Sequence, residues 1–269
     1  MAKAWDGVIT MPLSGRSVKP RTTGITMVID KGLGLARLKD LLETAGDYID
    51  IIKLTFGTSA FYDKDYLRRK NELIASAGVE VMPGGTFLEV AFWQKNIAGY
   101  FQRAQELGFT AIEISDGTID IPLPQRRDLI KQALDRGFKV ITEVGKKDPR
   151  QALPIALTHE LINSDAECGA FKVIIEAREA GKGVGIYDTE GQIKEEEIDN
   201  IVAGVNDPEI LLWEAPLKNQ QQALIIRWGV NVNLGNIPPD EVLALEALRQ
   251  GLRGDTLRRA YTANPEWSK

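Results

Sequence analysis

Residues 138–144 read FKVITEV and residues 170–177 read AFKVIIEA. Each segment is a short run rich in valine and isoleucine that reaches a glutamate at or near its end. A continuous apolar run of this length, bounded by glycine or charged residues, is typical of a strand buried on both faces, as in a parallel sheet. The two segments therefore predict parallel strands that each carry a carboxylate near the carboxyl end.

The same kind of segment recurs along the chain. Six further segments share it: residues 24–30, 48–54, 79–82, 110–114, 209–214 and 230–234. Stretches with helical spacing of apolar residues lie between them, for example Leu129, Ile130, Ala133 and Leu134. Strands that alternate with helices form a parallel sheet covered on its outer face. Eight such units predict a single (β/α)8 TIM barrel, with an open, doubly wound sheet as the alternative. We expect one domain over residues 1–269, with an N-terminal extension at 1–23 and a C-terminal tail at 257–269.

Composition excludes several classes of protein. The 269 residues carry 33 Lys plus Arg against 38 Asp plus Glu, a net charge of −5 without blocks of like charge, which argues against nucleic-acid or membrane binding. The single cysteine, Cys168, excludes a disulfide framework, and the single histidine, His159, excludes a two-histidine zinc site. The sequence contains no apolar run of about 18 residues. The first residues lack the apolar region of a signal peptide, so we expect a cytoplasmic protein.

Carboxylates are placed inside or at the ends of the apolar runs. The candidates are Asp30, Glu113, Glu143, Glu176 and Glu214. A carboxylate is costly to bury unless it is paired or binds a metal. One interpretation is that these groups form structural ion pairs with Lys53, Lys139 and Lys172. The other is that they hold a metal at the carboxyl ends of the strands, where barrel enzymes place their active sites. Oxygen ligands without histidine or cysteine favour Mg²⁺.

Cationic residues fall at the same predicted strand ends. They are Lys31, Lys53, Lys146, Lys147, Arg178 and Lys182. In an acidic protein this pattern predicts a binding site for a small, multiply anionic substrate, such as a phosphorylated acid. The alternative is ordinary solvated loop lysines. Because Lys53 lies inside an apolar run, we interpret it as functional or as part of a buried pair.

Glycine-rich turns follow three of the strands. They read GTS at 57–59, GGT at 84–86 and DGT at 116–118. Free backbone N–H groups at the start of a helix bind phosphate oxygens, although such glycines also occur simply because a turn is tight. From these turns and the neighbouring strand ends we expect substrate contacts from Gly84, Gly85, Thr86, Ser115, Asp116 and Asn233, together with Lys31 and Arg178. The segment REAGKGVGIY, residues 178–187, is predicted to close over the substrate.

Nine blocks of this sequence, in order from about Gly24 to Thr256, resemble the phosphosulfolactate synthase family. The blocks are TGITMVIDKGLG, DYIDIIKLTFGTSA, PGGTFLE, EISDGTIDI, ITEVGKK, VIIEAREAGKGVGIYD, EAP followed by QQ, VNLGNI and LEALRQGLRGDT. The resemblance implies a (β/α)8 barrel and a Mg²⁺-dependent lyase that adds sulfite to phosphoenolpyruvate to give (2R)-2-O-phospho-3-sulfolactate. In methanogens this reaction opens coenzyme M synthesis, and bacterial relatives supply sulfolactate.

Such a reaction needs a proton donor for the carbon next to the new bond. We predict one of the two lysines that follow the fifth strand, Lys146 in preference to Lys147, with Lys53 next, on the expectation that neighbouring cations and burial lower the pKa of the donor. Two other functions stay open at this point: another Mg²⁺-dependent barrel lyase or aldolase acting on a phosphorylated or sulfonated acid, and a heat-stress-associated relative without this chemistry. We also expect a homo-oligomer.

Overall fold

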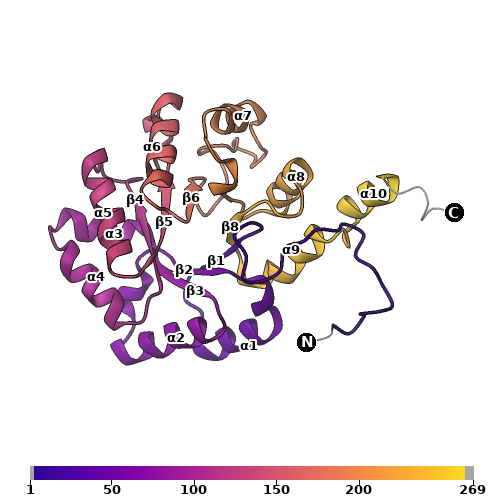
Figure 1. Cartoon of the computed structure of the whole chain (residues 1–269), viewed down its shortest axis with the longest axis horizontal. Helices are drawn as coiled ribbons and strands as arrows, with labels where there is room; N and C mark the ends of the chain where they lie inside the picture. The colour runs from indigo at the N-terminus through magenta and orange to yellow at the C-terminus, as the bar shows by residue number, and fades with distance from the viewer. Residues whose placement is uncertain (1–2, 264–269) are drawn as a thin grey trace.

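The computed structural model describes residues 3–263, which form a ring of parallel strands surrounded by helices (Figure 1). The strands are β1 (Thr26–Asp30), β2 (Ile51–Leu54), β3 (Glu80–Pro83), β4 (Ala111–Ser115), β5 (Lys139–Val144), β6 (Lys172–Ile175), β7 (Leu211–Glu214) and β8 (Leu234–Ile237). The order β3-β2-β1-β8-β7-β6-β5-β4 joins the first strand to the last. This pairing confirms the (β/α)8 barrel and excludes the doubly wound sheet, in which β1 and β8 would not be neighbours.

Helices surround the barrel, where they connect successive strands or follow the last strand. They are α1 (Leu35–Ala45), α2 (Lys64–Ser76), α3 (Gly85–Trp93), α4 (Ile97–Glu106), α5 (Leu123–Asp135), α6 (Ile155–Glu167), α7 (Glu195–Ala203), α8 (Lys218–Trp228), α9 (Val242–Arg249) and α10 (Gly254–Ala263). The predicted tail at 257–269 is therefore helical up to residue 263, and its remainder lies outside the described residues. No helix of the described part of the chain is long and apolar enough to cross a membrane.

The seam between β3 and β4 is held differently from the other strand pairs. Thr110 donates its backbone N–H to the Val81 carbonyl over 3.1 Å, and Val81 donates its own N–H to Thr110 Oγ1 over 2.9 Å. A threonine hydroxyl thus replaces one rung of the ladder. The ring is nearly closed at this point, so that side chains from all eight strands can face a common interior.

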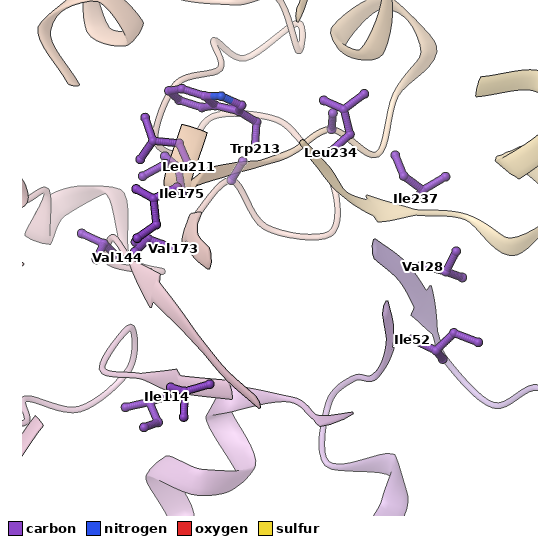
Figure 2. Close-up of a cluster of buried hydrophobic side chains, with 14 of the residues drawn as sticks. Val28, Ile52, Ile114, Val144, Val173, Ile175, Leu211, Trp213, Leu234 and Ile237 are labelled. Carbon is purple, nitrogen blue, oxygen red and sulfur yellow. The ribbon is translucent and has the colours of Figure 1, made fainter. Parts of the chain in front are cut away.

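One apolar layer lies on each side of the strands. Val28, Ile52, Ile114, Val173 and Ile175 belong to the outer layer, and they point away from the centre of the ring toward the helices (Figure 2). The inner layer is smaller and fills the barrel: Ile25, Met27, Ile51, Met82, Ala111, Ile141, Ile174 and Leu212. Strand side chains alternate between the two faces, so the inward residue that follows each inner apolar residue lies one level higher, toward the carboxyl ends.

The last strand begins four residues later than the predicted segment 230–234. Two asparagines explain the difference. The side chain of Asn231 accepts hydrogen bonds from the backbone and side chain of Ser17, and Asn233 bonds the backbone of Ile25, Glu209 and Leu211. These bonds tie residues 231–233 to the amino-terminal end of the barrel before pairing with β7 begins. The expectation that Asn233 contacts substrate at a carboxyl end is therefore wrong.

The N-terminal segment packs against the same amino-terminal end. Arg16 pairs with Glu246 at 3.1 Å, and Arg21 pairs with Asp50 at 2.9 Å. The backbone N–H of Leu13 donates to the Gln250 carbonyl just after α9, and the segment runs beside α9 and α10 (Figure 1). This end of the barrel is thus covered, and the opposite end is left open to ligands.

Candidate active site

A cavity of about 340 Å³ opens at the carboxyl ends of the strands. Its charged and polar lining comes from nearly every strand end: Lys53, Thr55, Gly84, Gly85, Thr86, Glu113, Glu143, Lys147, Glu176, Arg178, Glu179, Lys182, Glu214 and Asn236. The floor of the cavity is charged because inward-facing side chains on each strand are two residues apart. Ile51, Ile141 and Leu212 fill the inner apolar layer, and the next inward residues on the same strands are Lys53, Glu143 and Glu214. The barrel thus changes from apolar to charged within one level.

Lys53 stands at the centre of the floor. Its Nζ lies 2.9 Å from Glu113 Oε2, 3.4 Å from Glu143 Oε2 and 3.7 Å from Glu214 Oε1. Burial alone would lower the pKa of this ammonium, but the three carboxylates outweigh burial and raise it above its ordinary value. Lys53 is therefore a fixed positive charge at neutral pH.

Lys147 is the second cation of the floor. Its Nζ lies 2.7 Å from Glu143 Oε1 and 3.0 Å from Glu176 Oε2. Burial would lower the pKa of Lys147, but Glu143 and Glu176 raise it overall, which contradicts the predicted lowering for a proton donor in the isolated protein. An anionic substrate that draws the ammonium away from these carboxylates would remove part of that stabilisation.

The four glutamates differ in their affinity for a proton. Burial would raise the pKa of Glu143, but Lys147 and Lys53 overcome that effect and hold it well below its usual range. Burial, aided by the charge of Glu143, raises the pKa of Glu113 to about 7 in spite of Lys53. Burial also raises the pKa of Glu176 and of Glu214. The floor thus holds one firmly ionised carboxylate among three that bind protons more readily.

Charge and oxygen donors at the floor fit a divalent cation. Four buried glutamates face two lysines, and Glu113 Oε2 and Glu176 Oε2 are paired with the ammonium groups of Lys53 and Lys147 at 2.9 and 3.0 Å. Within residues 3–263 no group of three or more histidine, cysteine, aspartate or glutamate side chains is already gathered around one metal position. The lysines occupy the space between the carboxylates, so a metal would need them to move aside.

The amino terminus of α3 forms one wall of the cavity. Gly84 is its N-cap, and Gly84, Gly85 and Thr86 line the cavity. A Cβ at Gly85 would lie 2.6 Å from Ser115 Oγ and 2.7 Å from Glu113 Oε1, so only glycine lets the helix begin this close to β4. The first N–H groups of a helix have no partner within it and attract anions. This wall is suited to a phosphate.

Comparison with known proteins identifies the family. The family model for (2R)-phospho-3-sulfolactate synthase (ComA) matches residues 14–255. The chain is 45% identical over 251 residues to the phosphosulfolactate synthase of Methanothermobacter thermautotrophicus, covering 93% of this chain and 96% of that protein. It is 46% identical over 235 residues to the phosphosulfolactate synthase of Methanocaldococcus jannaschii, covering 87% of this chain and 93% of that protein. This chain belongs to the phosphosulfolactate synthase family.

Membership of the phosphosulfolactate synthase family makes this chain an enzyme and confirms the resemblance seen in the sequence. Among solved structures, phosphonopyruvate hydrolase in complex with oxalate and Mg²⁺ is similar, with a TM-score of 0.54 and 15% identity over 91% of this chain and 83% of that one. At this identity the similarity shows a shared barrel fold and nothing about the reaction.

Most of the predicted site residues of this family member do meet in the cavity. From the predicted set the structure brings together Lys53, Gly84, Gly85, Thr86, Glu113, Glu143, Lys147, Glu176, Arg178 and Glu214. Lys31 is half-exposed at the rim, where it pairs with Glu179. Of the three glycine-rich turns only GGT lines the cavity. In the DGT turn, the N–H groups of Thr118 and Ile119 already donate to Glu89.

Lys146 lies outside the cavity, contrary to its predicted preference over Lys147. Its Nζ donates to the Asp116 carbonyl at 2.6 Å and to Asp120 Oδ1 at 2.8 Å, in the turn after β4, and Lys146 does not line the cavity. The turn at Gly145 separates the two lysines as expected, but the lysine that it directs into the cavity is Lys147. Nearness to the strand in sequence did not decide which lysine enters the barrel.

Three further predicted residues are engaged elsewhere. Asp30 faces the outer layer, pairs with Lys70 at 2.6 Å and accepts the N–H groups of Gly32 and Leu33. Asp116 pairs with the buried Arg126 at 3.1 Å. Ser115 donates to Glu89 over 2.7 Å. None of these three lines the cavity, because strand alternation or a stronger local partner turns the side chain away.

Phe56 and Asn236 are among the cavity residues that lay outside the predicted set. Phe56 follows β2 and lines the mouth, and Asn236 lies within β8 and is 3% exposed. A strand-end asparagine in VNLGNI was visible in the sequence, but the misplaced strand favoured Asn233. Nothing in the sequence distinguishes Phe56 from a core aromatic residue.

Proposed function

We propose that this protein adds sulfite to phosphoenolpyruvate and forms (2R)-2-O-phospho-3-sulfolactate, with Mg²⁺ as cofactor. One observation carries the proposal: the cavity combines buried glutamates, two fixed lysines and a free helix amino terminus in a chain of this family. These are the groups needed to bind a phosphate, a carboxylate and a second anion side by side.

The phosphate of phosphoenolpyruvate is assigned to the α3 amino terminus. Gly85 and Thr86 present backbone N–H groups there, and Arg178 lines the same cavity. Backbone donors and a guanidinium together favour a dianion. Lys182 and Glu179, from the loop after β6, also line the cavity, which supports the predicted role of residues 178–187 in covering the substrate.

Mg²⁺ is assigned to the glutamates of the floor, Glu113, Glu143, Glu176 and Glu214. When bound, the ion supplies Lewis-acid stabilisation of the negative charge that develops on the substrate carboxylate. Asp30 is not part of this proposal, because Lys70 already neutralises it.

The residues of the chain then serve two purposes in the reaction. Lys53 and Lys147 offset the repulsion between two anions as they approach. The sulfur lone pair of sulfite forms a bond to the methylene carbon, and the π electrons of the carbon–carbon double bond move toward the carboxylate. The neighbouring carbon then accepts a proton, for which Lys147 is the donor at the cavity and is itself reprotonated from solvent. The phosphate ester stays intact throughout.

The test is turnover with purified protein. Phosphoenolpyruvate, sulfite and MgCl2 are incubated with the enzyme, and the product is identified by mass spectrometry and by chiral separation from the 2S isomer. We expect stoichiometric loss of both substrates without release of inorganic phosphate, and loss of activity in EDTA that Mg²⁺ restores. A homo-oligomer in the cytoplasm is part of the same proposal, and size-exclusion chromatography with light scattering tests the oligomer.

A further inference from the structure

A bulge in β8 gives the cavity a residue that ordinary strand alternation would exclude. Thr26 of β1 pairs with Leu234, and Val28 pairs with Ile237, so β1 advances two residues (26 to 28) while β8 advances three (234 to 237). One extra residue in a strand is a β-bulge, which re-aims a side chain. Leu234 and Ile237 both face the outer layer, and the two residues between them face inward.

The first of these two residues fills the interior. A Cβ at Gly235 would lie 2.5 Å from Leu212 Cδ2 and 2.7 Å from Met27 Cε, so a larger residue where β8 crosses the inner apolar layer would force those two side chains to shift. The second, Asn236, lines the cavity above that layer. The bulge thus places Gly235 in the packed interior and directs Asn236 into the charged site.

Backbone strain marks the same position. Four non-glycine residues among those described have positive φ: Phe56 (58°), Lys95 (55°), Arg178 (60°) and Asn236 (54°). Three of the four line the cavity, and only Lys95, at the end of α3, does not. Residues in sparsely populated backbone regions cluster at functional sites, where the surrounding structure holds them. Asparagine tolerates this region better than other side chains.

The carboxamide of Asn236 has no protein partner for its oxygen. Oδ1 is buried and accepts no hydrogen bond from any described residue. A buried polar atom without a partner is destabilising. Nδ2 of the same amide donates to no described residue, so at the edge of the cavity it can donate to a ligand, while Oδ1 can accept from a bound water.

We propose that Asn236 is a substrate-recognition residue whose carboxamide Nδ2 donates a hydrogen bond to an oxyanion group of the bound substrate, while Oδ1 accepts from a water bound with it. In the order of strands, β8 is three positions from β3, which leads into α3, so Asn236 meets a group other than the phosphate held at Gly85 and Thr86. A neutral amide can donate to an oxyanion without adding to the negative charge of the floor. The inference rests on the proposed function, because that function makes the oxyanion the carboxylate of phosphoenolpyruvate or the incoming sulfite.

Three variants test this assignment. Asn236→Gly removes the amide and is compatible with a positive φ, so its melting temperature should equal or exceed that of the wild type. Its kcat/KM should fall roughly 10- to 100-fold, the effect of one hydrogen bond to a charged group. Asn236→Asp keeps the shape and adds a negative charge, and its kcat/KM should fall further. Lys95→Gly is the matched control: the same backbone change away from the cavity, with kinetics unchanged.

Binding measurements separate the two sources of the oxyanion. Calorimetric titration with phosphoenolpyruvate alone and with sulfite alone, each in Mg²⁺, shows which ligand loses affinity in Asn236→Gly, and KM for that substrate should rise in parallel. Unchanged affinity for both ligands together with unchanged kinetics in both Asn236 variants would overturn the assignment. A further outcome is that the wild type binds phosphoenolpyruvate more tightly than Asn236→Gly does and yet forms no sulfonate. In that case the proposed reaction fails and the assignment of Asn236 stands. Should the glycine variant not fold, the aspartate variant carries the same test.

Discussion

Lys147 Nζ lies 2.7 Å from Glu143 Oε1 on β5, while the neighbouring Lys146 pairs with Asp120 at 2.8 Å, outside the cavity. The two adjacent lysines thus have different surroundings, one in the cavity and one outside it. This difference makes them a natural pair of test and control for the proton donor.

We expect Lys147→Met to lower kcat by a factor of about 1,000 or more, since it removes both a proton donor and a charge that opposes anion repulsion. Lys146→Met should retain kcat within a factor of about 10, because it loses only contacts at the Asp116–Asp120 turn. Steady-state kinetics at saturating Mg²⁺ gives both values. A larger loss of kcat in Lys146→Met than in Lys147→Met would contradict the assignment of Lys147.

Glu143→Gln should abolish most activity without unfolding the barrel. Glu143 is the one carboxylate bound by both lysines of the floor, at 3.4 Å from Lys53 and 2.7 Å from Lys147, and its pKa is held well below its usual range. The amide keeps the shape but loses the charge that orders both ammonium groups. We expect a weaker Mg²⁺ dependence as well, measured as the Mg²⁺ concentration for half-maximal rate. Wild-type values in this variant would remove Glu143 from the site.

The pKa of Glu113 predicts a pH-dependent stability in the absence of Mg²⁺. Its pKa rises from 4.5 to about 7 in the folded protein, so between these values the folded state holds a proton that the unfolded state has lost. The free energy of unfolding should therefore fall as pH rises from about 4.5 to about 7, by up to about 3 kcal/mol from this group.

Urea unfolding in EDTA at pH 5, 6, 7 and 8 measures this fall, and Glu113→Gln is the control because it cannot ionise. Above pH 7 the variant should be the more stable of the two proteins. Mg²⁺ should stabilise the wild type more at pH 8 than at pH 5. Parallel pH profiles for the two proteins would show that Glu113 does not carry a raised pKa.

Asp30 allows a test of whether a buried carboxylate of this protein is structural or belongs to the metal site. Both Asp30 and Lys70 are fully buried, and their charged atoms lie 2.6 Å apart. Breaking a buried pair by removing one partner costs about 3–5 kcal/mol, because the other charge is left alone. Lys70→Met should lower the free energy of unfolding by that amount, while the Mg²⁺ requirement of the folded fraction stays the same. A changed Mg²⁺ requirement with normal stability would return Asp30 to the metal site.

The sequence allowed prediction of the barrel because eight apolar runs and their helices obey simple periodicities. It also allowed prediction of the charged floor, because a glutamate or lysine inside such a run is energetically unusual. The sequence did not show which side chain enters the cavity where a single residue decides its direction. Lys146 and Lys147 are equivalent in sequence, and only the turn at Gly145 determines which one faces the cavity. Asn233 and Asn236 are likewise equivalent until the start of β8 and its bulge are known.

The central claim is tested most directly by following the reaction in D₂O by ³¹P and ¹H NMR. With phosphoenolpyruvate, sulfite and Mg²⁺, the account predicts one organic phosphate product that retains its ester, carries sulfur on the former methylene carbon and has one solvent-derived deuterium on the neighbouring carbon. Lys147→Met should form it far more slowly. Release of inorganic phosphate and pyruvate, or no consumption of sulfite by the folded, Mg²⁺-loaded protein, would contradict the account.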